Sequence, residues 1–124
     1  MKDYIDNVKI TESYDLNNIS KRLTDEKLIR LLHSAMGLST EANEILDMLK
    51  KHIYYDKKLD IPNLIEEAGD ILWYLAIMID ELNTSFEYIM KKNLEKLKSR
   101  YPEGFTNKNA INRDLKKERK IIEK

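Results

Sequence analysis

The sequence predicts an all-α protein, a bundle of helices that assembles into an oligomer, on three observations. Only three glycines and two prolines interrupt its 124 residues. Long stretches carry apolar residues three and four positions apart, a spacing that lines one face of a helix. The segment Ile71–Ile79 is apolar or aromatic on every side, so in a chain this small it needs a partner surface.

The chain is expected to hold one domain between two less regular ends. A length of 124 residues with 42% apolar composition suits a single core. We expect residues 1–23 to form an irregular N-terminal arm that can include a short helix. A helical domain over residues 24–106 follows, and residues 107–124 form a charged, loosely docked C-terminal helical tail.

The first helix of the domain is predicted to begin after a cap at Thr24, because the next two residues are acidic and suit a first turn. It runs to about residue 54. Its apolar residues trace one stripe that is expected to face the core: Leu28, Leu31, Ala35, Leu38, Ala42, Ile45 and Leu49.

The second and third helices have their own boundary signals. Asp60 is expected to cap the second helix, with Pro62 tolerated in its first turn and an end near Asn83. The segment Thr84–Glu87 is typical of a capping box and predicts a third helix that runs to about Ser99. A proline and a glycine close together then break the helix.

Composition and charge exclude several classes of function. The chain has 22 basic and 22 acidic residues, so no overall field draws it to nucleic acid or anionic lipid. It has no cysteine, which excludes disulfides, thiolate zinc sites and a cysteine nucleophile, and fits a reducing cytoplasm. The N-terminus is too polar for a signal peptide, and the longest apolar run is too short to span a bilayer. We therefore expect a cytoplasmic protein without a nucleic-acid or membrane partner.

Two acidic pairs, Glu41 with Glu44 and Glu67 with Asp70, mark the expected functional site. Residues three apart lie on one helix face, so each pair presents two carboxylates side by side. Four converging acids repel one another, and a hard cation such as Mg²⁺ removes that repulsion. Mg²⁺ held by carboxylates and water usually acts on phosphates.

The setting of these pairs separates them from other acids with the same spacing. On a helical wheel the first pair lies at the edge of the core stripe, in a strip with Gly37 and Met48. The second pair lies at the start of the apolar stretch of its helix, where its carboxylates are expected to be buried. A buried carboxylate destabilises the fold unless it is paired or binds a metal. Gly37 and Gly69 leave room for a backbone or a ligand. The alternative, that these acids are solvated or paired with lysines, stays open at this point.

Three ordered blocks, residues 32–47, 66–75 and 93–105, resemble the MazG-like family of nucleoside triphosphate pyrophosphohydrolases. These proteins are all-α and are related to the dimeric dUTPases and to phosphoribosyl-ATP pyrophosphatase. The resemblance implies a helical bundle of the all-α NTP pyrophosphatase type, with residues 24–106 as its catalytic domain. It also implies a homo-oligomer, a dimer or a tetramer.

The family carries an E-E-x-x-E block and then, on the next helix, an E-x-x-D block. Glu41 and Glu44 match the second and third acids of the first block, and Glu67 and Asp70 match the second block. By this resemblance the four acids hold Mg²⁺, with Mn²⁺ as an alternative. A water activated by the metal or by a glutamate, Glu41 or Glu44, then cleaves a (d)NTP between its α and β phosphates. The products are a nucleoside monophosphate and pyrophosphate.

The substrate is expected to meet residues outside the acidic pairs. Asn93, Lys96 and Arg100 share one face of the third helix and match the family block Asn-x-x-Lys-Leu-x-x-Arg-Tyr-Pro. The two cations would bind phosphates and Asn93 the sugar or base, although a solvated face has the same pattern. Trp73 and Tyr74 follow the second acidic motif and could stack on a base, but an aromatic pair in an apolar run is more often core or subunit interface.

The match leaves alternatives open. Thr40 stands where the fullest motif has its first acid, and whether Asp47 or Glu66 compensates is undecided. The leading hypothesis is nucleotide-pool housecleaning on canonical or altered nucleoside triphosphates. A narrower substrate, as in dUTPases or phosphoribosyl-ATP pyrophosphatase, is the close alternative. A non-catalytic helical oligomerisation or regulatory module is the third.

Overall fold

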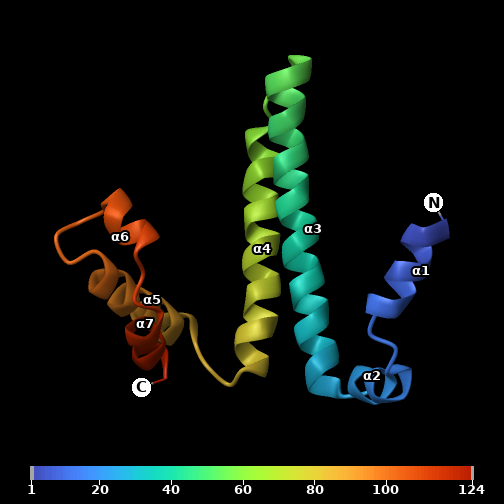
Figure 1. The fold of residues 1–124 in the computed structure, drawn as a ribbon. Coiled ribbons are helices and arrows are strands. Elements are labelled where there is room, and N and C mark those ends of the chain that lie inside the picture. Colours follow the sequence, from blue (N-terminus) through green and yellow to red (C-terminus); the bar gives the residue numbers. More distant parts are fainter. Residues whose placement is uncertain (1, 124) are drawn as a thin grey trace. The chain divides into compact units, whose positions relative to one another are not determined.

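The computed structural model describes residues 2–123 of the chain, apart from the side chain of Lys2. Met1 and Lys124, the outermost residues of the predicted arm and tail, lie outside the described residues. Every regular element between them is a helix, which confirms the all-α prediction for the described part of the chain (Figure 1). Contacts along the backbone group the chain into two compact units, residues 1–78 and 79–124, and each is described by itself.

The first unit begins with two helices where an irregular arm was expected. These are α1 (Lys2–Thr11) and α2 (Leu16–Leu23). The side chain of Asp15 accepts a hydrogen bond from the backbone N–H of Asn18 and caps α2. An aspartate at this position supplies an acceptor for one of the four unpaired N–H groups at a helix start. The segment of the predicted arm therefore contains more helix than its mixed polarity indicated, and the cap at Asp15 accounts for the second of its two helices.

A long helical hairpin, α3 (Glu26–Tyr55) and α4 (Ile61–Glu81), follows (Figure 1). The cap of α3 is Asp25, whose carboxylate accepts from the backbone N–H of Leu28 at 3.2 Å; the predicted cap, Thr24, instead ends α2. Asp56, in the left-handed region at φ 51°, closes α3. Asp60 accepts from the backbone N–H of Asn63 at 3.2 Å and caps α4 as predicted.

Small side chains on α3 let α4 approach closely. The ring of Tyr74 lies over Gly37, where an added Cβ would be 2.2 Å from the ring carbons. The hydroxyl of Ser34, fully buried, donates a 2.6 Å hydrogen bond to the backbone carbonyl of Tyr74. A Cβ at Gly69 would meet open space, with no atom of another helix among residues 2–123 within 4 Å, so Gly37 and not Gly69 serves the close approach of the two helices.

The expected core stripe of α3 is half right. Leu31, Leu38 and Ile45 are partly buried, whereas Leu28, Ala35, Ala42 and Leu49 are exposed. The buried face is shifted toward Ser34 and Gly37, because a tight helix–helix contact favours the residues with the least side chain at the crossing.

The second unit contains the last part of α4 and three further helices: α5 (Phe86–Arg100), α6 (Asn107–Ile111) and α7 (Leu115–Ile122). The cap of α5 is Ser85, which accepts from the backbone N–H of Tyr88, one residue beyond the predicted Thr84. Gly104 takes a φ of 102° and ends the helical path, as the Pro–Gly segment predicts. The tail forms two helices, and α7 packs on α5.

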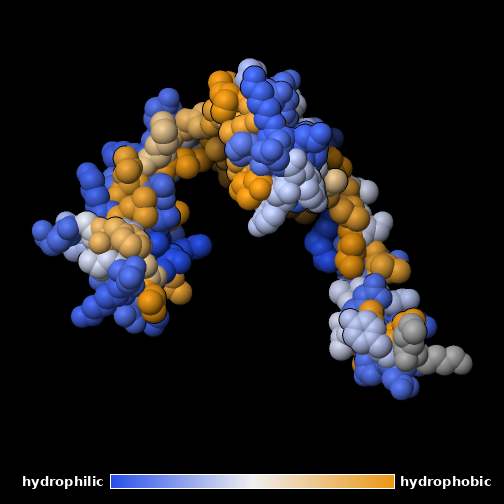
Figure 2. Space-filling model, turned by 90° about the horizontal axis from the view of Figure 1, so that it is seen from above, coloured by the Kyte–Doolittle hydropathy of each residue, from blue (hydrophilic) through white to orange (hydrophobic). Residues whose placement is uncertain are grey.

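Large apolar side chains remain exposed over much of the described chain. Ile71–Ile79 was expected to be buried on most sides, yet Leu72 and Trp73 are 56% and 58% exposed and Ile79 is its one fully buried member. Figure 2 shows such hydrophobic side chains at the surface between hydrophilic ones. No helix among residues 2–123 has the length and hydropathy needed to cross a bilayer.

Candidate metal centre

The hairpin gathers three carboxylates in one place. Glu41 comes from α3, and Glu67 and Asp70 come from α4; one oxygen from each lies within 4.8 Å of the others. The spacing of three places Glu67 and Asp70 on one face of α4. We call these three side chains the acidic cluster.

Two contacts on either side of the cluster fix the register of the hairpin. Toward one end Gly37 meets the ring of Tyr74, and toward the other the amide of Asn63 donates to the sulfur of Met48 at 3.0 Å. Glu41 lies between Gly37 and Met48 on α3. The antiparallel pairing of the helices therefore carries Glu41 to the acids of α4.

Glu67 is the buried member of the cluster, only 6% exposed. Burial raises the pKa of its carboxyl group, and the nearby carboxylates of Glu44 and Glu41 raise it further. The amide of Asn63 donates to Glu67 Oε1 at 3.1 Å, which opposes these effects in part. The cluster thus holds more negative charge than its surroundings neutralise.

Glu44 lies beside the cluster and outside it. Its side chain is exposed one turn after Glu41, yet it is close enough for its charge to raise the pKa of Glu67. Of the four predicted ligands, the structure brings three together and places the fourth next to them. Glu44 lines an open pocket with the following residues: Asn43, Asp47, Met48, Lys51 and Asn63.

Thr40, the departure from the family motif, contacts a cluster residue. Its hydroxyl lies 3.1 Å from Glu41 Oε1 and 2.9 Å from the backbone carbonyl of Gly37, and it can donate to either. Asp47 instead pairs with two lysines, at 3.1 Å to Lys50 and 2.6 Å to Lys51, which lowers the pKa of its carboxyl group. Neither Asp47 nor the exposed Glu66 belongs to the cluster.

The donor set suits a hard divalent cation. Carboxylate oxygens are the ligands that Mg²⁺ and Mn²⁺ prefer, and Mg²⁺ commonly uses one or two of them and completes its shell with water and phosphate oxygens. Exposed Asp70 and half-buried Glu41 leave one side of the cluster open to solvent. The residues present therefore fit a metal ion that also contacts a phosphate.

The other predicted site residues lie elsewhere on the chain. Trp73 is on α4, with its ring edge-on to Tyr74 at a centroid distance of 5.0 Å. Asn93, Lys96 and Arg100 are on α5 in the second unit, and Arg100 is held by an ion pair. Their contact with a substrate at the acidic cluster stays a prediction.

Sequence reasoning missed the partner of Arg100. This is Glu118 on α7, which also binds Arg113. No local periodicity connects residues 18 positions apart in different helices, and a glutamate in a charge-rich tail has no distinguishing pattern. The only available signal was that an arginine in a phosphate-binding motif needs a carboxylate or a phosphate as a partner.

Comparison with known proteins gives two matches. Residues 30–105 match the family model of the MazG nucleotide pyrophosphohydrolase domain. The chain is also 35% identical over 88 residues to the gene 37 protein of Mycobacterium phage L5, covering 67% of this chain and 76% of that protein. No solved structure shows a significant match.

Proposed function

The chain belongs to the MazG nucleotide pyrophosphohydrolase domain family, and on that premise we propose that it hydrolyses nucleoside triphosphates with Mg²⁺. The reaction cleaves a (d)NTP between the α and β phosphates and releases a nucleoside monophosphate and pyrophosphate. It would serve nucleotide-pool housecleaning. The observation that carries the proposal is the acidic cluster on α3 and α4, whose three carboxylate oxygens lie within 4.8 Å of one another.

The four acids divide between two tasks in this mechanism, cation binding and proton transfer. Glu41, Glu67 and Asp70 hold the cation, and the buried Glu67 is the most firmly fixed of them. When bound, Mg²⁺ supplies charge neutralisation on the phosphates and lowers the pKa of a bound water. Exposed Glu44 stands beside the cluster, where its carboxylate can take a proton from the attacking water. The water oxygen then bonds to one phosphorus of the α–β bridge while that phosphorus loses its bond to the bridging oxygen. The bridging oxygen leaves on the other phosphate, which gives the nucleoside monophosphate and pyrophosphate.

Phosphate and base recognition are assigned to cations and an aromatic ring outside the cluster. Arg100 and Lys96 bind the phosphates and Asn93 contacts the sugar or base. Trp73 is exposed enough to stack on the base. Replacing it by leucine is expected to change the preference among bases; an altered oligomer mass with unchanged preference would assign Trp73 to a subunit interface instead.

A homo-oligomer, a dimer or a tetramer, is part of the proposal. The support is the exposed apolar surface of the hairpin, which includes Leu32, Met36 and Leu72. Such residues in contiguous stretches of a helix pair mark an interaction surface. Light scattering that gives the mass of a single chain at micromolar concentration would contradict this assignment.

The deciding experiment incubates the protein with a panel of canonical and altered nucleoside triphosphates and Mg²⁺ and measures pyrophosphate. We expect pyrophosphate release from at least one nucleotide. The rates of release rank the substrates, and the panel includes dUTP and phosphoribosyl-ATP. The double variant Glu41→Gln with Asp70→Asn should be inactive, whereas Glu66→Gln, an exposed acid outside the cluster, should keep full activity.

Pyrophosphate release by the double variant at the wild-type rate would contradict the enzymatic proposal. No release from any nucleotide would do the same and would favour the helical oligomerisation or regulatory module.

A further inference from the structure

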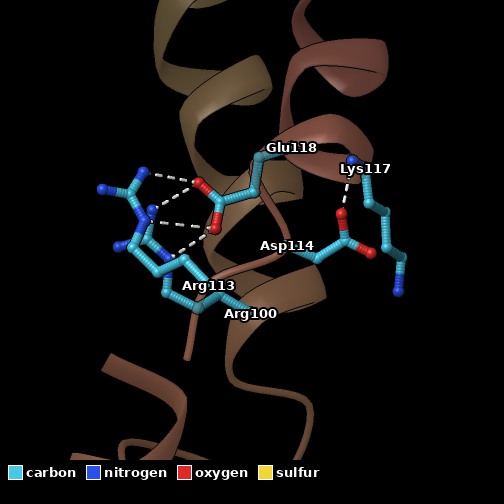
Figure 3. A network of polar contacts seen from close by, with 5 residues as sticks. All are labelled: Arg100, Arg113, Asp114, Lys117 and Glu118. Atoms are coloured by element: carbon cyan, nitrogen blue, oxygen red, sulfur yellow. Dashed lines mark hydrogen bonds and ion pairs between the residues drawn. The ribbon is translucent and has the colours of Figure 1, made fainter. Parts of the chain in front are cut away.

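Arg100 is fixed by a buried carboxylate from the tail. Its Nε donates to Glu118 Oε1 at 2.9 Å and one terminal nitrogen donates to Oε2 at 2.6 Å (Figure 3). Arg113 binds the same carboxylate in the same way, with distances of 3.4 and 2.7 Å. Glu118 is 6% exposed, and the two guanidinium groups lower the pKa of its carboxyl group to about 2. The carboxylate is therefore ionised at any working pH.

The partner of Arg100 comes from outside the family domain. The family match ends at residue 105, whereas Glu118 lies on α7, Leu115–Ile122. Arg100 itself lies inside the match. It belongs to the sequence block that, by resemblance to the family, is expected to contact the substrate. The tail is thus an addition to the matched region, and its buried acid binds a residue of that region.

The geometry leaves part of Arg100 available. A guanidinium group has five N–H donors, and Glu118 uses the edge formed by Nε and one terminal nitrogen. Figure 3 shows the remaining terminal nitrogen pointing away from Glu118. The ring of Tyr101 lies 5.6 Å from the guanidinium carbon and restricts the group further. Glu118 and Tyr101 therefore hold Arg100, whose side chain is 14% exposed, in one orientation, and the terminal nitrogen that points away from Glu118 is not used by that carboxylate.

We propose that Glu118 is a positioning residue for Arg100, which it holds ready to bind a phosphate group of the triphosphate substrate through the terminal nitrogen that Glu118 leaves unused. The inference rests on the proposed function for the role of Arg100. Two guanidinium groups around one carboxylate keep a net positive charge, so the arrangement still attracts a phosphate. An arginine already ordered by the fold loses less side-chain freedom on binding than a free one.

The test uses the full-length protein and inorganic tripolyphosphate without metal, by calorimetry, followed by KM and kcat with the best nucleotide and Mg²⁺. Glu118→Gln is expected to weaken tripolyphosphate binding and to raise KM by about five- to tenfold, with kcat within about twofold. Arg100→Gln should weaken binding at least as much.

Two control variants distinguish the positioning of Arg100 by Glu118 from the loss of a negative charge in the tail and from weaker packing of the tail. Glu123→Gln makes the same substitution on the segment that follows α7, at a carboxylate that pairs with Arg119; it should leave binding unchanged. Arg113→Ala removes the other guanidinium group from Glu118 but keeps both hydrogen bonds to Arg100. It removes one positive charge, so it should lower the Tm and weaken tripolyphosphate binding, but by less than Glu118→Gln does. All affinities are compared well below the Tm of each variant.

Several outcomes would overturn the inference. Tighter tripolyphosphate binding by Glu118→Gln would make Glu118 a competitor of the phosphate. Unchanged binding, or equal weakening by Arg113→Ala, would reduce it to a structural contact. If Arg100→Gln bound tripolyphosphate as tightly as the wild type does, Arg100 would not bind the phosphate and the inference would fail. Binding that depends on Arg100 and Glu118 without pyrophosphate release from any nucleotide would support the inference and contradict only the proposed hydrolysis.

Discussion

Two glutamates, one in each unit, are equally buried and have opposite surroundings. Glu67 and Glu118 are each 6% exposed. Glu67 stands among the acids Glu41 and Glu44, and burial together with their charges raises its pKa. Glu118 stands between Arg100 and Arg113, which lower its pKa to about 2.

The difference shows which of the two buried carboxylates is neutralised by residues of the chain itself. A buried carboxylate is stable when cations or donors surround it and costly when they do not. Glu118 has its countercharges, Arg100 and Arg113, within the second unit, so the chain itself stabilises its ionised form. Glu67 has one amide donor, from Asn63, and two negative neighbours. A proton or a bound cation can neutralise it, and the proposed function assigns that role to Mg²⁺.

Removing the unpaired carboxylate should have the largest effect on activity. Glu67→Gln is expected to reduce nucleotide hydrolysis by at least about 100-fold, because it removes the buried ligand of the cation. Without metal the Tm should stay equal or rise, and Mg²⁺ should no longer raise it. Pyrophosphate release and thermal melts with and without Mg²⁺ measure both effects. The exposed neighbour Glu66→Gln is the control; a large loss of metal-free stability in Glu67→Gln would contradict the comparison.

The close contact that builds the acidic cluster can be tested with a pair of glycines. Gly37→Ala places a methyl group against the Tyr74 ring and should destabilise the protein by about 1–3 kcal/mol, as overpacked sites do. It should also weaken Mg²⁺ binding, since α3 and α4 must separate. Gly69→Ala has open space and should instead stabilise α4 by about 0.5–1 kcal/mol. Chemical denaturation measures both, and equal effects would refute the close-contact model.

Acid should act on the two glutamates in opposite directions. The folded-state pKa of Glu118 is depressed from 4.5 to about 2, so its stabilisation is present above pH 4.5 and is lost as pH falls toward 2. The folded-state pKa of Glu67 is raised, so without metal its destabilising charge disappears as pH falls through that pKa. Melts of wild type against Glu118→Gln and Glu67→Gln at stepwise lower pH should therefore show each difference shrinking, with opposite signs.

The smallest expected effect concerns Asn63, whose amide donates to Glu67. Asn63→Ala should weaken Mg²⁺ binding by about two- to tenfold, the equivalent of one neutral hydrogen bond. Asn43→Ala, an exposed amide that bonds only the Ser39 carbonyl at 2.7 Å among its described contacts, is the control. Calorimetric titration with Mg²⁺ distinguishes them. Equal affinities for the two variants would show that the amide does not orient Glu67.

The predictions from sequence succeeded where the cause is local. Asp60 caps α4 as expected, and the ends of α3 and α4 lie within a few residues of their predicted positions. Each of these features depends on a helical turn and its cap, which neighbouring residues decide. The caps at Asp25 and Ser85 were missed by one residue, because an adjacent threonine satisfies the same rule.

The tertiary structure decided which helix faces meet. The sequence determined the all-α class, the helical hairpin and the chemistry of its acids, because periodicity, caps and side-chain charge are written residue by residue. It did not determine that Ser34 and Gly37 both contact Tyr74 of α4, nor that Glu118 binds Arg100. Those contacts depend on how closely two helices approach, and that distance is set by both surfaces together.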